Sequence, residues 1–276
     1  MSVRVWVDGE MVDDKPSVRA LDHGITVGDG VFETAKVVDG KPFAIDRHND
    51  RLDRSLHGLG LPSADRARLQ EGFDAVLAEP LDFGRLRYTV TAGEGPLGSD
   101  RSDSPLTYIV ASMPVDRPTP TTKIVVVPWT RNERSAVAGL KTTSYAENVV
   151  ALAAAKKEGG SEAIFANNRG ELCEGTGSNI FVVVDGELLT PKLECGPLAG
   201  ITRALTIEWS REAGIPVREE ILPIDVLDTA DEVFITSSTR DVQAVSAVGD
   251  RELAAPGPIT SKAAAAFAEA SAAGRD

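Results

Sequence analysis

The chain has 276 residues, of which 42% are hydrophobic and 26% charged, the balance of an ordinary globular protein. Its net charge of −13 (29 basic against 42 acidic residues) argues against binding to nucleic acid or to anionic membranes, which requires basic patches. No apolar run approaches the roughly 20 residues of a membrane-spanning helix, and the charged N-terminus lacks the apolar core of an export signal. Two cysteines (Cys173, Cys195) and three histidines are too few for a disulfide framework or a zinc cluster. We therefore expect a cytoplasmic protein without a metal site.

Residues 1–113 predict a small α+β domain. The stretches VRVWVDGEMV and VFETAKVVDGKPFAI each place Asp-Gly between β-rich arms, which predicts two hairpins. Asp46 is expected to cap a helix over DRHNDRLDRSLHGLG, whose leucines share one face. A second helix over about 64–79 and the strands RLRYTVTAG and LTYIVASM complete this block.

Three prolines mark residues 114–122 as the linker to a second domain. Residues 123–276 predict a larger α+β domain. Its expected elements are a strand in KIVVVPW, an Ala-rich helix after Lys141, hairpin strands in EAIFANNRGEL and SNIFVVVDGELLTP, a helix in ITRALTIEWSREAG, strands near 217–222, 232–237 and 242–248, and a terminal Ala-rich helix.

One glycine motif does not indicate a nucleotide-binding site. GEGPLG (93–98) satisfies the dinucleotide glycine pattern, but it contains a proline and leads into SDRSDSP rather than a helix. No helix N-terminus follows to bind a pyrophosphate, so we expect a loop.

Lys141 stands at the start of an apolar segment, AGLKTTSYAENVVALAAAK, although a lone lysine is ordinarily a surface residue. Two features elsewhere in the sequence indicate that Lys141 belongs to a functional site. In ELCEGTGSNIFVVV, Glu174 precedes small residues and a buried strand, where a carboxylate needs a partner. In PLAGITRALTIEW, Gly200, Ile201 and Thr202 open a helix, whose free N–H groups attract anions.

A second anion site is expected where the strand in FITSSTRD ends in four consecutive hydroxyl residues, 236–239. A lysine, a carboxylate and two anion sites are the groups that pyridoxal-phosphate enzymes use to hold the aldehyde, the pyridine nitrogen and the phosphate. The sequence therefore favours pyridoxal-phosphate chemistry over other cofactors.

The sequence resembles the class IV (fold type IV) pyridoxal-phosphate family of branched-chain aminotransferases, D-amino-acid aminotransferases and 4-amino-4-deoxychorismate lyases. The resemblance runs nearly end to end, through LDHGITVGDGVFETAKVVDGKPFAIDRHNDRL, GLKTTSYAEN, NNRGELCEGTGSNIFVV, GITR and FITSSTRDVQAV. It implies two mixed α/β domains of the D-amino-acid aminotransferase-like type and pyridoxal 5'-phosphate as cofactor. It also implies a homodimer in which loops of one small domain close the other subunit's site.

Carried over residue by residue, Lys141 matches the lysine that forms a Schiff base with the cofactor, and Glu174 matches the acid facing the pyridine nitrogen. Arg51 of NDRL matches a phosphate-binding arginine. The other phosphate-binding positions are Ile201, Thr202, Ser237, Ser238 and Thr239. Tyr145 is spaced slightly differently from the family's cofactor-contacting tyrosine, so it either bonds the ring hydroxyl or only packs nearby.

The sequence defines the substrate specificity less clearly than the cofactor. GDGVFE resembles the D-amino-acid and lyase branches, but Phe32 replaces the tyrosine of the D-amino-acid enzymes and Ala92 replaces their carboxylate-binding arginine. Arg85 and Arg87 alternate onto one strand face, where they either supply that charge or lie exposed. His23 and Arg134 are further candidates without a spacing argument.

Three activities stay open: a transaminase of D-amino acids and (R)-amines with a 2-oxo acid acceptor, an aminodeoxychorismate lyase, and a branched-chain L-amino-acid aminotransferase. The same cofactor site serves all three, so fold does not separate them. The intact lysine, acid and phosphate set disfavours a non-catalytic binding protein.

Overall fold

The computed structural model describes residues 3–276, which form two compact units that each mix helices and strands, as predicted for an α+β protein. Unit 1 contains the residues up to Arg117 together with Leu140–Tyr145, and unit 2 contains Pro118–Gly139 and Ala146–Asp276. The chain thus first enters unit 2 within the expected linker, residues 114–122. The segment around Lys141, expected among the residues of the second domain, packs with unit 1.

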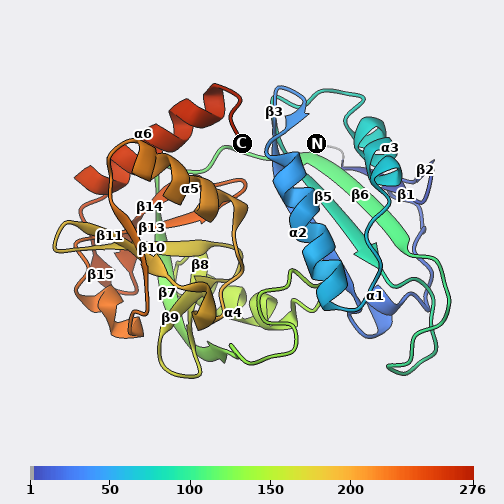
Figure 1. Cartoon of the computed structure of the whole chain (residues 1–276), viewed down its shortest axis with the longest axis horizontal. Coiled ribbons are helices and arrows are strands. Elements are labelled where there is room, and N and C mark those ends of the chain that lie inside the picture. Colours follow the sequence, from blue (N-terminus) through green and yellow to red (C-terminus); the bar gives the residue numbers. More distant parts are fainter. Residues whose placement is uncertain (1–2) are drawn as a thin grey trace. The chain divides into compact units, whose positions relative to one another are not determined.

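Unit 1 is built on a six-stranded antiparallel sheet with the strand order β2-β1-β6-β5-β3-β4 (Figure 1). The strands are β1 (Arg4–Val7), β2 (Glu10–Met11), β3 (Gly30–Val38), β4 (Lys41–Pro42), β5 (Phe83–Thr91) and β6 (Thr107–Pro114). The helices are α1 (His23–Thr26), α2 (Ile45–Gly58) and α3 (Arg66–Val76).

Both Asp-Gly hairpins predicted for this unit form, as β1–β2 and β3–β4. In each turn the two residues have positive φ, with 48° and 107° for Asp8 and Gly9 and 49° and 75° for Asp39 and Gly40. Positive φ at both turn positions matches the twist of an antiparallel pair, which is why Asp-Gly is favoured there.

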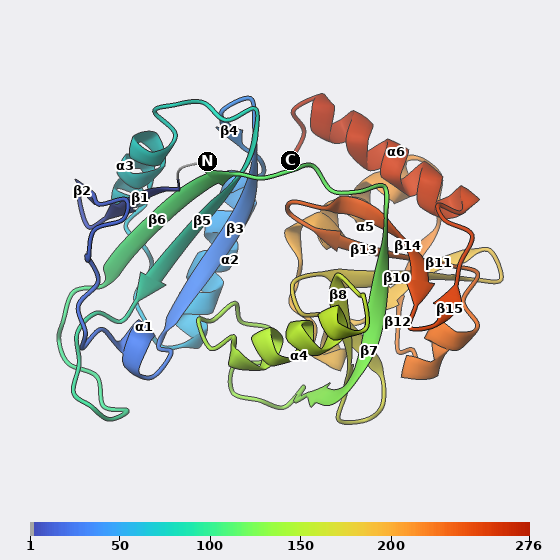
Figure 2. The same ribbon diagram turned by 180° about the vertical axis from the view of Figure 1, so that it is seen from behind.

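Helices α2 and α3 cover one face of the sheet. Strand side chains alternate, so Val31, Val37, Leu86, Tyr88 and Val90 all point to that face and are buried. The helices add Leu52, Leu56, Leu69, Phe73 and Val76 to the same core. Figure 2 shows β6, β5 and β3 side by side with α2 behind them. The other face of β3 and β5 carries the alternate side chains, and these include candidate site residues.

Helix α2 begins differently from the prediction. Its N-cap position holds Ala44 in a left-handed conformation (φ 53°, ψ 38°), without a side-chain hydrogen bond. Asp46 is therefore not the cap, and it lies instead in the first turn, where a negative charge stabilises the helix dipole. In α3, Asp65 does cap, accepting the N–H groups of Ala67 and Arg68.

Unit 2 is built on a nine-stranded mixed sheet with the order β12-β11-β10-β13-β14-β7-β8-β9, and β15 pairs with β14. The strands are β7 (Thr121–Arg131), β8 (Glu162–Asn167), β9 (Leu172–Gly175), β10 (Asn179–Val184), β11 (Glu187–Pro191), β12 (Val217–Glu220), β13 (Glu232–Ser237), β14 (Asp241–Val248) and β15 (Arg251–Glu252). The helices are α4 (Ala146–Lys157), α5 (Ile201–Glu212) and α6 (Pro258–Ala272), with 3-10 turns η1 (Leu193–Cys195) and η2 (Ile224–Asp228).

This sheet curls, because β9 pairs with β8 at one end and also contacts β10 near the middle. A core that includes Ile124, Ile164, Leu172, Ile180 and Ile235 fills the inside of the curl. On the other side, α5 and α6 pack over β10 and β13, and α4 packs over β7 and β8. The curl brings the end of β9, the start of β10 and the end of β13 close together, and these ends carry the candidate site residues of unit 2.

Across residues 3–276, no helix is long and apolar enough to cross a membrane.

Candidate active site

The Lys141 segment is held by backbone pairing with β3. Phe32 N–H donates to the Lys141 carbonyl at 3.0 Å, and Thr143 N–H donates to the Gly30 carbonyl at 2.8 Å. The Lys141 N–H donates to the hydroxyl of Ser55 on α2 at 3.1 Å. The segment therefore pairs with β3 through an isolated antiparallel bridge between Val31 and Thr142, which fixes the direction in which the Lys141 side chain leaves the backbone.

Four candidate residues of unit 1 meet at one aromatic pair. Phe32 and Tyr145 pack edge to face with ring centroids 4.9 Å apart. Lys141 Nζ lies 4.4 Å from the centre of the Phe32 ring and donates to Tyr145 Oη at 3.2 Å. The Arg87 guanidinium lies 3.6 Å from the same Phe32 centroid. Two cations thus share one ring, an arrangement stabilised by cation–π attraction and suited to an anionic ligand.

Arg85 is not part of this cluster. It points to the same face as Arg87, but it pairs with Lys36 of β3, whereas Arg87 pairs with Thr34, nearer to Phe32. Partial burial and the neighbouring charge of Arg85 lower the pKa of Arg87. The structure therefore distinguishes Arg87 from Arg85, two residues that could not be distinguished from the sequence.

Arg51 is buried and forms a two-bond ion pair with Glu33. Its Nε donates to Oε1 at 2.8 Å and its Nη2 donates to Oε2 at 2.7 Å. His48 Nδ1 lies 2.7 Å from the same Oε2. Burial alone would raise the pKa of Glu33, but Arg51 and His48 hold it at about 2. Burial also lowers the pKa of His48, assisted by the charges of Arg51 and Lys141.

In unit 2, Glu174 sits at the end of β9 with a cation beside it. Its Oε1 lies 3.4 Å from Arg131 Nε, and its Oε2 accepts the Leu198 N–H at 2.9 Å. Arg131 is held in turn by Glu147 and Asn148 of α4, and its guanidinium lies over the Phe165 ring at 4.3 Å. Glu174 is therefore an acid held in a fixed position.

Asn179 connects Glu174 to both expected phosphate segments. Its side chain donates to the Leu198 carbonyl at 2.9 Å, and Leu198 is the residue whose N–H binds Glu174. A Cβ at Gly200, the N-cap of α5, would collide with the Asn179 amide oxygen. Across the sheet, Asn179 pairs with Thr236, which is followed by Ser237, the last residue of β13, and by the turn that begins with Ser238 and Thr239. One asparagine thus brings the acid, the start of α5 and the hydroxyl turn together.

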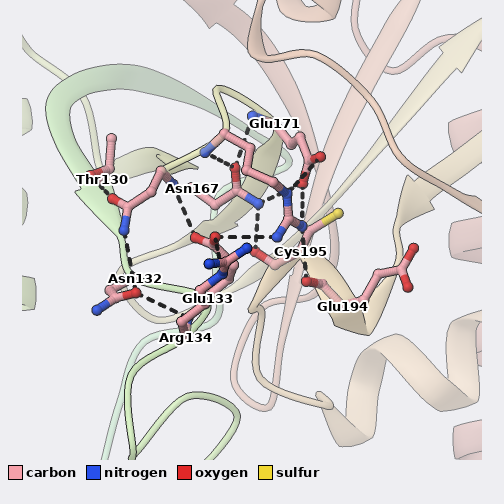
Figure 3. A network of polar contacts seen from close by, with 10 residues as sticks. Thr130, Asn132, Glu133, Arg134, Asn167, Glu171, Glu194 and Cys195 are labelled. Carbon is pink, nitrogen blue, oxygen red and sulfur yellow. Dashed lines mark hydrogen bonds and ion pairs between the residues drawn. The ribbon is translucent and has the colours of Figure 1, made fainter.

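A polar network secures the loops that lead to these residues (Figure 3). Arg169 binds Glu171 through Nε and Nη2, at 2.9 and 2.6 Å, and Glu133 through Nη1 at 3.2 Å. Arg169 also donates to the Glu194 carbonyl, and Asn167 donates to the Cys195 carbonyl. The hydrogen bond from Arg169 lowers the pKa of Glu171 to about 2. The network joins the loop before Lys141, the turn before Glu174 and the segment before α5.

Pyridoxal phosphate fits these groups. The first N–H groups of α5 have no side-chain cap, which leaves a helix start suited to a phosphate. The buried Thr236 hydroxyl, beside the hydroxyl turn, has no hydrogen-bond partner among residues 3–276. In unit 1, Lys141 is a half-buried amine with a phenol at hydrogen-bond distance. The donor set therefore provides an amine, an acid and anion sites, as this cofactor requires.

Two weaker candidates lie elsewhere. His23 is buried and binds the Pro96 carbonyl at 3.0 Å, so it holds the loop formed by GEGPLG, which is not followed by a helix. The side chain of Arg134 is 84% exposed. Neither shares a hydrogen bond or ion pair with Lys141 in the described part of the chain.

Three residues of the site were missed by sequence reasoning: Glu33, His48 and Arg131. Glu33 had a signal, because it shares strand parity with the buried Val31 and Val37, and a buried carboxylate needs a cation. His48 lies three residues before Arg51 on α2, which is helical spacing toward a shared partner. Arg131 had no signal, since a lone arginine at a strand end is common.

The chain belongs to the class IV amino-transferase family, whose family model matches residues 30–248. It is therefore a pyridoxal-phosphate-dependent enzyme that acts on small amino and keto compounds. Its sequence resemblance to this family is confirmed.

The relatives carry different activities in their names. A Methanocaldococcus jannaschii protein, provisionally named a branched-chain-amino-acid aminotransferase, is 32% identical over 90% of this chain and 89% of its own. The aminodeoxychorismate lyase of Bacillus subtilis is 29% identical over 86% and 84%. The D-alanine aminotransferase of Bacillus licheniformis is 28% identical over 94% and 93%. The family is thus common to all three, but the substrate is not.

Solved structures agree on the fold. The branched-chain aminotransferase of Thermoproteus uzoniensis, crystallised with norvaline, has a TM-score of 0.89 and 29% identity over 98% of this chain and 94% of its own. An aminotransferase from Brucella abortus, bound to pyridoxal phosphate, has a TM-score of 0.87 and 27% identity over 98% and 99%.

The Glu33–Arg51 pair predicts a specific pH dependence of stability. Below pH 4.5, the ordinary pKa of a glutamate, the unfolded chain takes up a proton that folded Glu33 refuses until about pH 2. Glu33 should therefore contribute about 3 kcal/mol at neutral pH, lost as the pH falls from 4.5 to about 2. His48, with its lowered pKa, should add a loss that begins below pH 6.5.

Urea unfolding of the cofactor-free Glu33→Gln variant tests this. At pH 7 the variant should lose about 3–5 kcal/mol, because Arg51 stays buried without its anion, and its stability should vary less with pH below 4.5. Glu71→Gln on the exposed side of α3 is the control. Equal stability of the two variants at pH 7 would contradict the role of Glu33 as the buried ion-pair partner of Arg51.

Proposed function

We propose that the chain is an aminotransferase that moves an amino group between an amino acid and a 2-oxo acid. The observation that carries this proposal is the cluster at Phe32, where Lys141 and Arg87 share one ring beside the Tyr145 hydroxyl. An amine for proton transfer and a guanidinium for a carboxylate are the two groups that a transaminase needs next to its cofactor.

Lys141 is assigned as the residue that holds the cofactor covalently. Bound pyridoxal phosphate supplies an electron sink for the carbanion formed at the substrate α-carbon. Lys141 Nζ would take the proton from that carbon and deliver it to the cofactor's aldehyde carbon, C4′, and the hydrogen bond to Tyr145 would orient Nζ for the transfer. Phe32 limits the directions that the lysine side chain can take.

The remaining cofactor contacts follow from the charges. Glu174, which lies beside Arg131, would hold the nitrogen of the pyridine ring. The N–H groups of Ile201 and Thr202 and the hydroxyl groups of Ser237, Ser238 and Thr239 bind the phosphate. We assign Arg51 as a further phosphate ligand from its match to the family's phosphate-binding arginine, and Glu33 fixes its orientation.

Arg87 is assigned as the residue that binds the substrate carboxylate. It is the guanidinium that shares the Phe32 ring with Lys141, and among residues 3–276 no carboxylate forms an ion pair with it. Arg85, one position further along the same face, plays a secondary role. This contact replaces the arginine that the D-amino-acid enzymes carry where this chain has Ala92.

For the amino donor we propose amino acids with small or aliphatic side chains. The GDGVFE segment favours D-amino acids, which makes D-alanine the first donor to test, and relatives named for D-alanine and for branched-chain amino acids support the aliphatic class. Aminodeoxychorismate cleavage is the second candidate, supported by the lyase relative.

We also propose that the chain acts as a homodimer. Light scattering that finds a monomer at assay concentration would contradict this. The cytoplasmic location stays a prediction.

The donor is tested by adding D-alanine, and separately L-leucine, to the purified protein while its visible absorbance is recorded. A donor should abolish the cofactor's visible band, and a 2-oxo acid should restore it. The amino acid that does so assigns the substrate series: D-alanine indicates D-amino acids, and L-leucine indicates branched-chain L-amino acids. A band unchanged by both, with release of 4-aminobenzoate from aminodeoxychorismate, would contradict the transaminase and favour the lyase.

Arg87→Met and Arg85→Met form a matched pair for the carboxylate contact. Arg87→Met should raise the half-saturating concentration of the amino acid by roughly 10-fold or more, because a charge-assisted contact is lost. Arg85→Met should have a smaller effect. The corresponding amine, which has no carboxylate, should react equally with both variants. If Arg87→Met impaired the reaction of this amine as much as that of the amino acid, Arg87 would only support the fold.

A further inference from the structure

Glu162 is a buried carboxylate that the proposed chemistry does not use. It opens β8 and is only 4% exposed. No cation contacts it among residues 3–276, and its partners are three neutral donors. Burying a carboxylate is costly, and without a cation only the hydrogen bonds from these donors compensate for the lost water.

All three donors come from one short turn. Glu162 Oε1 accepts the Thr176 N–H at 3.0 Å and the Thr176 hydroxyl, and Oε2 accepts the Ser178 hydroxyl at 3.1 Å. The turn also fits closely on the carboxylate, because a Cβ at Gly175 would lie 3.1 Å from Glu162 Cδ. Glu162 therefore acts as an internal ligand that determines the shape of this turn.

The turn joins two residues assigned to the cofactor. Glu174 precedes it at the end of β9, and Asn179 follows it at the start of β10. Asn179 in turn contacts Leu198 and Gly200 next to the phosphate-binding start of α5. A change in the turn would move the acid and the phosphate groups relative to each other.

We infer that Glu162 is a positioning residue for cofactor binding, which sets the separation between the pyridine-binding acid Glu174 and the phosphate-binding groups around Asn179. The inference rests on the proposed function. It goes beyond it by assigning cofactor affinity to a residue that does not touch the cofactor.

The chain offers a matched control in Glu232. This glutamate is also buried in the sheet of unit 2, and it accepts the N–H groups of Ile259 and Thr260 at the first turn of α6, at 3.0 and 2.7 Å. It lies at the opposite end of β13 from Ser237. Removing either carboxylate leaves buried N–H groups without an acceptor, so both substitutions should reduce stability.

Glu162→Met and Glu232→Met are compared with the wild type by titrating each cofactor-free protein with pyridoxal phosphate. Glu162→Met should raise the dissociation constant by roughly 10-fold or more and shift the pH at which the cofactor's visible band changes. Glu232→Met should leave both unchanged. Glu162→Gln should restore most of the affinity, because one oxygen still accepts from Thr176 while the Ser178 hydroxyl can reverse and accept from the amide.

If Glu162→Met does not fold, Thr176→Val tests the same contact, since it removes one donor to Glu162 and keeps the backbone N–H. It should weaken cofactor binding in the same direction by a smaller factor. If Glu162→Met folds and keeps the wild-type affinity and spectrum, the inference is overturned but the proposed function is not. If Glu162→Met does not fold, the same result in Thr176→Val overturns the inference. A wild-type chain that binds no pyridoxal phosphate would overturn the proposed function and the inference together.

Discussion

Pairing between residues 140–145 and the start of β3 is the constraint on which the site of unit 1 depends. The hydrogen bonds from the Phe32 N–H to the Lys141 carbonyl and from the Thr143 N–H to the Gly30 carbonyl place Lys141 next to the Phe32 ring. Glu33 follows Phe32 in the same strand, so its side chain lies on the face opposite to Phe32, where it binds Arg51. Consecutive strand residues point to opposite faces, so one short stretch serves both the lysine and the buried arginine.

Buried carboxylates organise both units in a similar way. Glu33 fixes a cation, Arg51, whereas Glu162 and Glu232 fix backbone and hydroxyl donors of a turn and of a helix start. Glu174, which is only partly buried, combines a cation with a backbone donor. Each carboxylate is satisfied locally, which offsets its desolvation and gives the surrounding backbone one preferred conformation.

The strands and helices were largely predictable, because hairpin turns, strand alternation and helix caps are encoded within a few neighbouring residues. The Asp-Gly turns formed where expected, and β13 ended at the predicted hydroxyl run. The start of α2 was not predictable, because a left-handed Ala44 has no local sequence signal.

The site was predictable only in part, for a physical reason. The family motifs give the residue types that contact a cofactor, such as Lys141 and Glu174. The supporting residues Arg131 and Glu162 act through contacts with segments distant in sequence. Such contacts depend on which strands become neighbours, so a single sequence does not reveal them. The choice between Arg85 and Arg87 likewise required the register of β3 against β5.

The central claim is that Lys141 is the residue that holds the cofactor. It is tested most directly by reducing the purified, cofactor-loaded protein with borohydride, which fixes the cofactor to its lysine as a stable amine, and by mapping the modified peptide with mass spectrometry. The structure predicts a single phosphopyridoxyl group on the peptide that contains Lys141. A label on Lys36, the buried lysine of β3, or on any lysine other than Lys141, would contradict the account.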